Sequence, residues 1–131
     1  MNPSRFSRLI DIAKALYHQN LRCFHVTFIL KKGKILSIGT NSSKTHPRNT
    51  RLNYRGQDGS DLRYQIGTHA ELSAVLRYGA EDCSDCIFVN IRVDKNGQLL
   101  YSHPCAGCSS LMRQIGFKKF YYSTVNGFEI L

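Results

Sequence analysis

The sequence contains no hydrophobic stretch that approaches the length of a membrane span, which needs about 20 mostly apolar residues. An export signal is missing as well. The N-terminal segment MNPSRFSRLIDIAKALYHQN carries Arg5, Arg8, Asp11 and Lys14 and lacks the continuous apolar block of a signal peptide. We therefore expect a cytoplasmic protein with no membrane partner. Internal repeats are absent too, and 131 residues suit a single domain, 1–131, with one hydrophobic core.

Acidic residues are scarce: nine Asp and Glu stand against eighteen Lys and Arg, which gives a net charge of +9. An excess of positive charge on a small domain is typical of proteins that bind a polyanion such as nucleic acid. A solvated basic surface that only aids solubility explains the same charge, and composition does not separate the two. The hydrophobic content of 42% and the charged content of 21% are ordinary for a soluble globular protein.

The cysteines do not form an even set. There are five, in a chain without an export signal, which argues against a disulfide framework. A metal-binding or catalytic role is the better expectation for at least some of them.

Hydrophobic periodicity predicts a helix at the start of the chain, with Ser4 as its N-cap. Its apolar residues recur at helical spacing and should pack in the core: Phe6, Leu9, Ile10, Ala13, Leu16 and Tyr17. Residues 22–30 alternate, and the segment KKGK followed by ILSIG predicts a hairpin. Phe24, Val26, Phe28 and Leu30 then share one face. Cys23 and His25 lie on the other face, where we expect packed residues.

The second half of the chain predicts alternating elements. A helix covers 69–79 and ends at Gly79, a buried strand covers 86–93, and a helix covers 105–115 between Pro104 and Gly116. A strand over 119–125 is followed by a turn at Asn126–Gly127 and a short returning strand. This order predicts an α/β fold: a three-layer α-β-α domain whose mixed five-stranded sheet ends in an antiparallel C-terminal hairpin.

Residues 41–67 are rich in Asn, Ser, Gly and Arg and show almost no apolar periodicity. A long irregular loop in a small domain is uncommon and is usually either functional or disordered. Two acidic residues, Asp58 and Asp61, stand against five basic ones: Lys44, Arg48, Arg51, Arg55 and Arg63. The loop leads directly into the segment GTHAELSAV.

That segment admits two interpretations. Thr68 and Glu71 have the spacing of a capping box, in which both side chains satisfy free backbone N–H groups at a helix start. Alternatively, His69 and Glu71 serve a functional site beyond the helix end, where residues two apart can reach a common point.

The segment SHPCAGCSS favours the functional interpretation. Cys105 and Cys108 lie at i and i+3 at the start of a helix, so both sulfurs project on one side of its first turn. This spacing is a standard half of a zinc site, and a catalytic zinc needs only one further protein ligand. His69 can supply it. Helix N-termini favour the negative charge of thiolates.

The pattern H-x-E followed by P-C-x-x-C, here THAE and HPCAGC, resembles the signature of zinc-dependent nucleobase deaminases. The order of elements resembles the cytidine deaminase-like fold over nearly the whole chain. The resemblance implies that His69, Cys105 and Cys108 bind Zn²⁺, with a water activated as hydroxide in the fourth position. It implies that Glu71 moves protons without binding the metal, and that cytosine is converted to uracil.

Further substrate contacts are predicted around this site. Similar proteins often place an Asn after the second strand, where it contacts the base or sugar, and Asn41 has that position. A turn Asn is the alternative. The other candidates are Lys44, His46, Arg48, Ala70 and His103. His46 and His103 adjoin prolines and are explained equally as turn residues.

Cys83 and Cys86 form a second C-x-x-C. A structural zinc with partners such as His18 or His25 is one interpretation, and a pair of reduced, partly buried thiols is the better one.

The resemblance predicts the reaction better than the substrate. The Arg-rich loop and the net charge favour cytosine on a phosphate-bearing substrate, either single-stranded DNA or RNA or a nucleotide such as dCMP. The alternatives are a free cytidine or deoxycytidine deaminase, a purine deaminase for adenine or guanine, and a non-catalytic zinc-stabilised nucleic-acid-binding module. The C-terminal hairpin resembles the branch with an antiparallel last strand rather than the tRNA-editing and dCMP-type branches. Relatives often form homo-oligomers.

Overall fold

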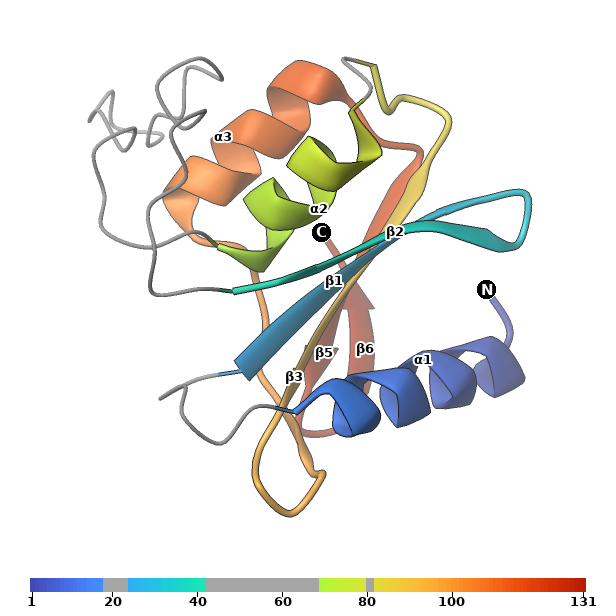
Figure 1. The fold of residues 1–131 in the computed structure, drawn as a ribbon, viewed down its shortest axis with the longest axis vertical. Coiled ribbons are helices and arrows are strands. Elements are labelled where there is room, and N and C mark those ends of the chain that lie inside the picture. The colour runs from blue at the N-terminus through green and yellow to red at the C-terminus, as the bar shows by residue number, and fades with distance from the viewer. Residues whose placement is uncertain (18–23, 42–68, 80–81) are drawn as a thin grey trace.

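A central sheet lies between two helical layers in the computed structural model, which describes residues 1–17, 24–41, 69–79 and 82–131 (Figure 1). Helix α1 (Pro3–Leu16) covers one face, and helices α2 (Ala70–Tyr78) and α3 (Ala106–Ile115) lie side by side on the other. The strands are β1 (Phe24–Lys31), β2 (Lys34–Thr40), β3 (Ile87–Val93), β4 (Leu99–Leu100), β5 (Lys119–Thr124) and β6 (Gly127–Ile130). None of the described helices has the length and apolar character that crossing a membrane requires.

The sheet is mixed and six-stranded, with the order β2-β1-β3-β5-β6 and with β4 beside β3. Strands β3 and β5 run parallel, and the other described pairs are antiparallel. The three layers, the mixed sheet and the C-terminal hairpin β5–β6 confirm the predicted fold class. The two-residue strand β4 is an addition to the five strands expected from the sequence.

Each face of the sheet carries its own hydrophobic core. On the α1 side, Leu9 and Ala13 pack against the alternating set predicted from the sequence: Phe24, Val26, Phe28 and Leu30. On the other side, Leu72 of α2 and Leu111 of α3 pack against residues such as Ile29, Phe88 and Phe120. Because β1 and β3 are buried on both faces, they read as near-continuous apolar runs. Leu16, expected in the core, is 42% exposed at the end of α1.

Two predicted boundaries are wrong by one or two residues. Asn2, not Ser4, is the N-cap of α1, and its Oδ1 accepts a hydrogen bond from the Arg5 N–H at 3.0 Å. Pro3 explains the shift, because it has no N–H and its fixed φ suits the first helical position. At the other end of the chain, Thr124 pairs with Gly127, so the hairpin loop is Val125–Asn126 rather than Asn126–Gly127.

Helix α2 lies unusually close to strand β2. A Cβ placed on Gly39 would lie 2.3 Å from the Ala74 N and 2.4 Å from the Ala70 O, so only glycine fits beneath the helix backbone. The Ser37 hydroxyl donates to the Ala74 carbonyl at 2.8 Å and anchors the same turn. These contacts set the height of α2, and therefore of the residues at its N-terminus, above the sheet.

A buried polar network holds the segment that leads into α3. Asn90 of β3 accepts from the Thr27 hydroxyl at 2.6 Å and donates to the Ser102 carbonyl at 3.2 Å. The Ser102 hydroxyl donates to the Asn90 carbonyl at 3.0 Å and accepts from the Ser123 N–H at 2.7 Å. Residue 102 is thereby tied to both β3 and β5, which positions the chain that continues through His103 and Pro104 to Cys105.

Candidate metal centre and active site

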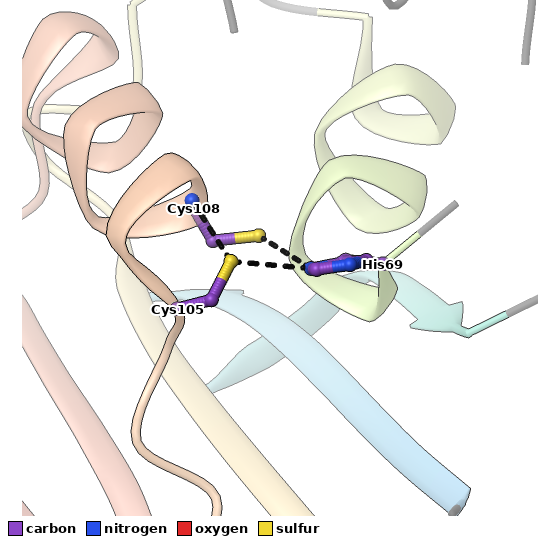
Figure 2. Close-up of side chains that lie close together, drawn as sticks. All are labelled: His69, Cys105 and Cys108. Atoms are coloured by element: carbon purple, nitrogen blue, oxygen red, sulfur yellow. Dashed lines mark hydrogen bonds between the residues drawn. The ribbon is translucent and has the colours of Figure 1, made fainter. Parts of the chain in front are cut away.

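Three potential metal ligands meet between the N-terminal ends of α2 and α3 (Figure 2). His69 is the N-cap of α2, Cys105 is the N-cap of α3, and Cys108 lies in the first turn of α3. The His69 Nδ1 lies 3.3 Å from the Cys105 Sγ and 3.4 Å from the Cys108 Sγ. Of the residues that the structure describes, these are the His, Cys, Asp or Glu side chains grouped closely enough to hold a metal ion.

The geometry fits zinc. A tetrahedral zinc ion bound about 2.3 Å from sulfur and about 2.0 Å from an imidazole nitrogen holds those two atoms roughly 3.5 Å apart. The two observed nitrogen–sulfur distances of 3.3 and 3.4 Å are close to that value. Two thiolates and one imidazole form a donor set that zinc prefers, and three protein ligands leave a fourth position open.

The thiol of Cys105 is set up to ionise. Its pKa is lowered to about 3, first by a hydrogen bond with the Cys108 side chain and then by hydrogen bonds from His69 and from the Cys108 N–H. The same contact raises the pKa of His69, because the Cys105 thiolate stabilises the imidazolium. A thiolate at a helix N-terminus also gains from the helix dipole.

Glu71 is buried in the first turn of α2, with 4% of its surface exposed. Burial is the main reason that its pKa is raised, and contacts with Cys108 and His69 oppose this shift. The capping-box interpretation does not fit. Helix α2 has His69 as its N-cap, so Glu71 is its second residue, whereas the box requires the third. Thr68 lies outside the described residues.

A cavity of about 200 Å³ opens beside the three ligands. Pockets for drug-sized ligands measure about 300–1,000 Å³, so this volume suits a single heterocyclic base. The described residues that line it are His25, Asn41, His69, Ala70, Glu71, His103 and Cys105. Three of the predicted substrate contacts, Asn41, Ala70 and His103, therefore lie at the cavity. The other three, Lys44, His46 and Arg48, lie outside the described residues.

Asn41 is held in place by the end of β1. Its Oδ1 accepts from the His25 N–H at 2.9 Å, and its own N–H donates to the His25 carbonyl at 3.3 Å. The side chain thus completes the β1–β2 ladder where β2 ends, and this explains why an amide follows the strand. Asn41 combines this structural role with a position at the cavity wall.

His25 is the residue that the sequence analysis missed. We expected a packed side chain, but the imidazole lines the cavity and is close enough to His69 and Cys105 for their charges to act on it. Burial first, and then the positive charge of Arg92, lower its pKa to about 4, so the ring is neutral at neutral pH. The alternation of β1 indicates this position, because Phe24 and Val26 face α1 and His25 therefore points to the other face of the sheet, which α2 and α3 cover.

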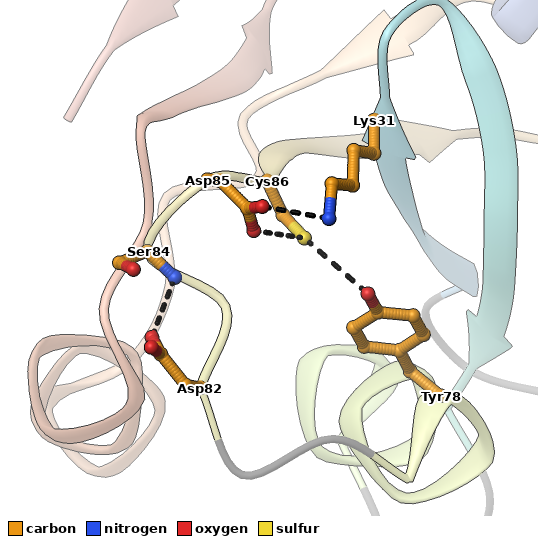
Figure 3. A network of polar contacts seen from close by, with 6 residues as sticks. All are labelled: Lys31, Tyr78, Asp82, Ser84, Asp85 and Cys86. Carbon is orange, nitrogen blue, oxygen red and sulfur yellow. Dashed lines mark hydrogen bonds and ion pairs between the residues drawn. The ribbon is translucent and has the colours of Figure 1, made fainter.

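Cys83 and Cys86 lie elsewhere, in the connection between α2 and β3, and both are completely buried. The Cys86 Sγ lies 3.9 Å from the Tyr78 Oη and 3.7 Å from the Asp85 Oδ1, and Asp85 forms an ion pair with Lys31 at 2.7 Å (Figure 3). Burial raises the pKa of Cys83 to about 11. Within the described ranges, no third potential ligand completes a metal site with this pair, and His18 lies outside them.

Solved structures with a similar fold exist for nearly the whole chain. A dCMP deaminase from the cyanophage S-TIM5, solved in complex with dCMP and dUMP, superposes with a TM-score of 0.59 at 22% sequence identity, covering 93% of this chain and 82% of that one. A cytidine deaminase from Burkholderia pseudomallei superposes with a TM-score of 0.61 at 14% identity, covering 100% and 92%. A cytidine deaminase from Mycobacterium leprae superposes with a TM-score of 0.54 at 18% identity, covering 99% of this chain and 93% of that one. No protein-family model and no curated protein matches the sequence. The likeness lies in the fold.

Proposed function

We propose that the chain is a zinc-dependent hydrolytic deaminase that converts cytosine to uracil in a phosphate-bearing substrate. One observation carries this proposal: His69 and Cys105, two members of a His–Cys–Cys ligand set, line the same cavity of base size as the buried Glu71. The likeness of the fold to a dCMP deaminase and to cytidine deaminases supports it.

His69, Cys105 and Cys108 would hold the zinc ion, which when bound lowers the pKa of a water molecule so that it can attack near neutral pH. Glu71 then has the task of moving protons. It accepts one proton from the attacking water and delivers it to N3 of the ring, then moves the proton of the new C4 hydroxyl to the amino group as the C4–N bond breaks. A C4–O bond forms, ammonia leaves, and a carbonyl remains. The burial of Glu71 suits this task because it raises the pKa of the carboxyl group, which strengthens the carboxylate as a base toward the attacking water.

The remaining cavity residues would orient the base. Asn41 presents an amide at one wall and His103 presents a ring at the cavity, while Ala70 keeps the space beside Glu71 small. The hydrogen bond between the His25 N–H and Asn41 fixes the amide before substrate arrives. A preformed wall of this kind lowers the cost of placing C4 beside the attacking oxygen.

A phosphate-bearing substrate is favoured over a free nucleoside by the net charge of +9. The solved cyanophage enzyme with the similar fold binds the nucleotides dCMP and dUMP. Between a mononucleotide and a single strand, the charge favours the strand. Homo-oligomer formation belongs to the same proposal and rests on resemblance alone.

The test is a substrate panel read by uracil formation: cytidine, deoxycytidine, dCMP, dCTP, single-stranded DNA and RNA, and adenine and guanine nucleosides. Glu71→Gln should lower turnover by about 10²–10⁴-fold, the range that a general acid–base contributes, while zinc per chain stays at the level of the unchanged protein. Asp11→Asn is the matched control, because Asp11 is an exposed residue of α1, on the face of the sheet opposite the cavity. This variant should keep full activity.

Each alternative has its own outcome in this panel. Turnover of free nucleosides alone contradicts a phosphate-bearing substrate. Turnover of adenine or guanine nucleosides alone shows that the target base is a purine rather than cytosine. A protein that turns over nothing, yet binds an oligonucleotide equally well with and without Glu71→Gln, is a zinc-stabilised binding module.

A further inference from the structure

Three aromatic rings form a cluster directly beside the cavity. The rings of Tyr101 and His103 are nearly parallel, with an interplanar angle of 10° and centroids 6.0 Å apart. Tyr122 packs edge-on against both, at 4.9 Å from His103 and 5.9 Å from Tyr101. Tyr122 is the buried member, and its hydroxyl donates to the Glu129 carboxylate at 2.9 Å. Tyr101, by contrast, is 57% exposed.

The cluster is held rigidly. Ser102, between Tyr101 and His103, is 1% exposed and belongs to the network that joins β3 and β5. The Nδ1 of His103 lies 2.8 Å from the Pro104 carbonyl, which fixes the ring plane. Tyr101 therefore adjoins a fixed segment, and its ring packs against His103 and Tyr122 while more than half of the residue stays exposed.

The cluster is continuous with the candidate active site. His103 belongs both to the ring cluster and to the cavity lining, and it lies two residues before the ligand Cys105. Positive charge is close: Arg92 pairs with Leu100 in the β3–β4 ladder, next to Tyr101, and acts electrostatically on the cavity residue His25. The cavity that is expected to hold a cytosine thus has an exposed ring next to its lining residue His103 and a cation next to its lining residue His25.

We propose that Tyr101, backed by His103, is a stacking surface for the base next to the target cytosine, so that the substrate is a single strand of at least two nucleotides. The inference rests on the proposed function and extends it. Proteins that bind single strands combine positive charge with aromatic side chains on which successive bases stack, and such stacking tolerates any base because every base has a π-face. Tyr101 is a positioning and specificity residue, remote from the reacting atoms.

The kinetic test compares two substrates in each variant. Tyr101→Ala should lower the ratio of kcat/KM for a cytosine-containing dinucleotide to kcat/KM for dCMP by roughly 5- to 150-fold, the range produced by losing one base–aromatic stack. Tyr101→Phe should restore the ratio, since it keeps the ring. Leu36→Ala, which removes a 41% exposed apolar side chain on β2, is the control and should leave the ratio unchanged. An abasic neighbour should lower the ratio for the unchanged protein and have no further effect in Tyr101→Ala.

A binding test does not depend on turnover. Zinc-loaded Glu71→Gln is mixed with short strands that carry 2-aminopurine on either side of cytosine, and stacking is detected as quenching of its fluorescence. We expect quenching on one side, its loss when Tyr101→Ala is added, and its retention with Tyr101→Phe.

The two tests separate failure of the inference from failure of the proposed function. Turnover of cytosine substrates without an effect of Tyr101→Ala on ratio or quenching overturns the stacking surface and leaves the deaminase. Tyr101-dependent quenching without any turnover retains the surface and overturns the deaminase. If Tyr101→Ala lowers kcat/KM equally for dCMP and for the dinucleotide, the inference is also overturned, because Tyr101 then has a merely structural role.

Discussion

At the scale of single residues, the described cysteines form two chemically distinct pairs. Cys105 and Cys108 face an imidazole at a helix N-terminus, where the pKa of Cys105 falls to about 3. Cys83 and Cys86 belong to the hydrophobic core beneath α2 and α3, and burial raises the pKa values of both. Metals bind the thiolate, so the first pair is prepared for a metal and the second is not.

This contrast predicts the outcome of a paired substitution. We expect Cys105→Ser to bind less zinc than the unchanged protein, because a hydroxyl replaces a thiolate ligand, whereas Cys83→Ser should match the unchanged protein in zinc per folded chain. Zinc is measured by mass spectrometry of the metal after gel filtration, with circular dichroism to count folded protein. Equal zinc loss in both variants would show that the second pair also holds metal.

Part of the candidate site could be predicted from residue types alone. The His69, Glu71 and Cys105–Cys108 pattern is informative because few chemistries need two thiols, an imidazole and a carboxylate at helix starts. His25 could not be assigned in the same way. Its role depends on which side chains from other segments lie opposite it, and alternation indicates the face without naming the neighbours.

At the scale of elements, the position of α2 depends on Gly39, which has no side chain. Gly39→Ala would place a Cβ 2.3 Å from the backbone of α2, so the helix must move away from β2 and take His69 and Glu71 with it. We expect a destabilisation of about 1–3 kcal/mol, typical of overpacking, and a weaker affinity for zinc. Chemical denaturation with and without zinc measures both.

The control for this prediction is an alanine where space is available. A Cβ added at Gly79 meets no atom of the described residues within 4 Å, but the φ of 76° at this position destabilises alanine through the backbone alone. Gly79→Ala should therefore lower stability without changing zinc affinity. A Gly39→Ala protein with unchanged affinity would show that the helix does not set the ligand position.

The order of elements was predictable because the apolar period changes clearly along the chain, from helical to alternating and back. Details that depend on tertiary contacts were not. Strand β4 contains only Leu99 and Leu100, too few for a periodicity, and exists because β3 offers them a partner. The shift of the last turn follows from Gly127, which begins β6 at a φ of 133° instead of completing the turn.

At the scale of the whole molecule, the charge of +9 has a measurable consequence. If the substrate is a strand, each phosphate contacted releases counterions, and the logarithm of the binding constant falls with a slope of about −0.7 per contact in single strands. Strand binding should therefore weaken steeply between 50 and 200 mM salt, whereas dCMP binding should change little. Fluorescence anisotropy of a labelled oligonucleotide measures the slope, and a flat dependence would assign the charge to solubility.

Strand β3 lies between β1 and β5 in the sheet and separates the two ligand-bearing segments along the chain. His69 precedes it, and the thiols of Cys105 and Cys108 follow 36 and 39 positions after His69. Helices α2 and α3 both rest on the face that β3 helps to build, so the assembled sheet holds the imidazole beside the thiols. We therefore expect metal loading late in folding, because the three ligands are held together by a sheet that assembles without them.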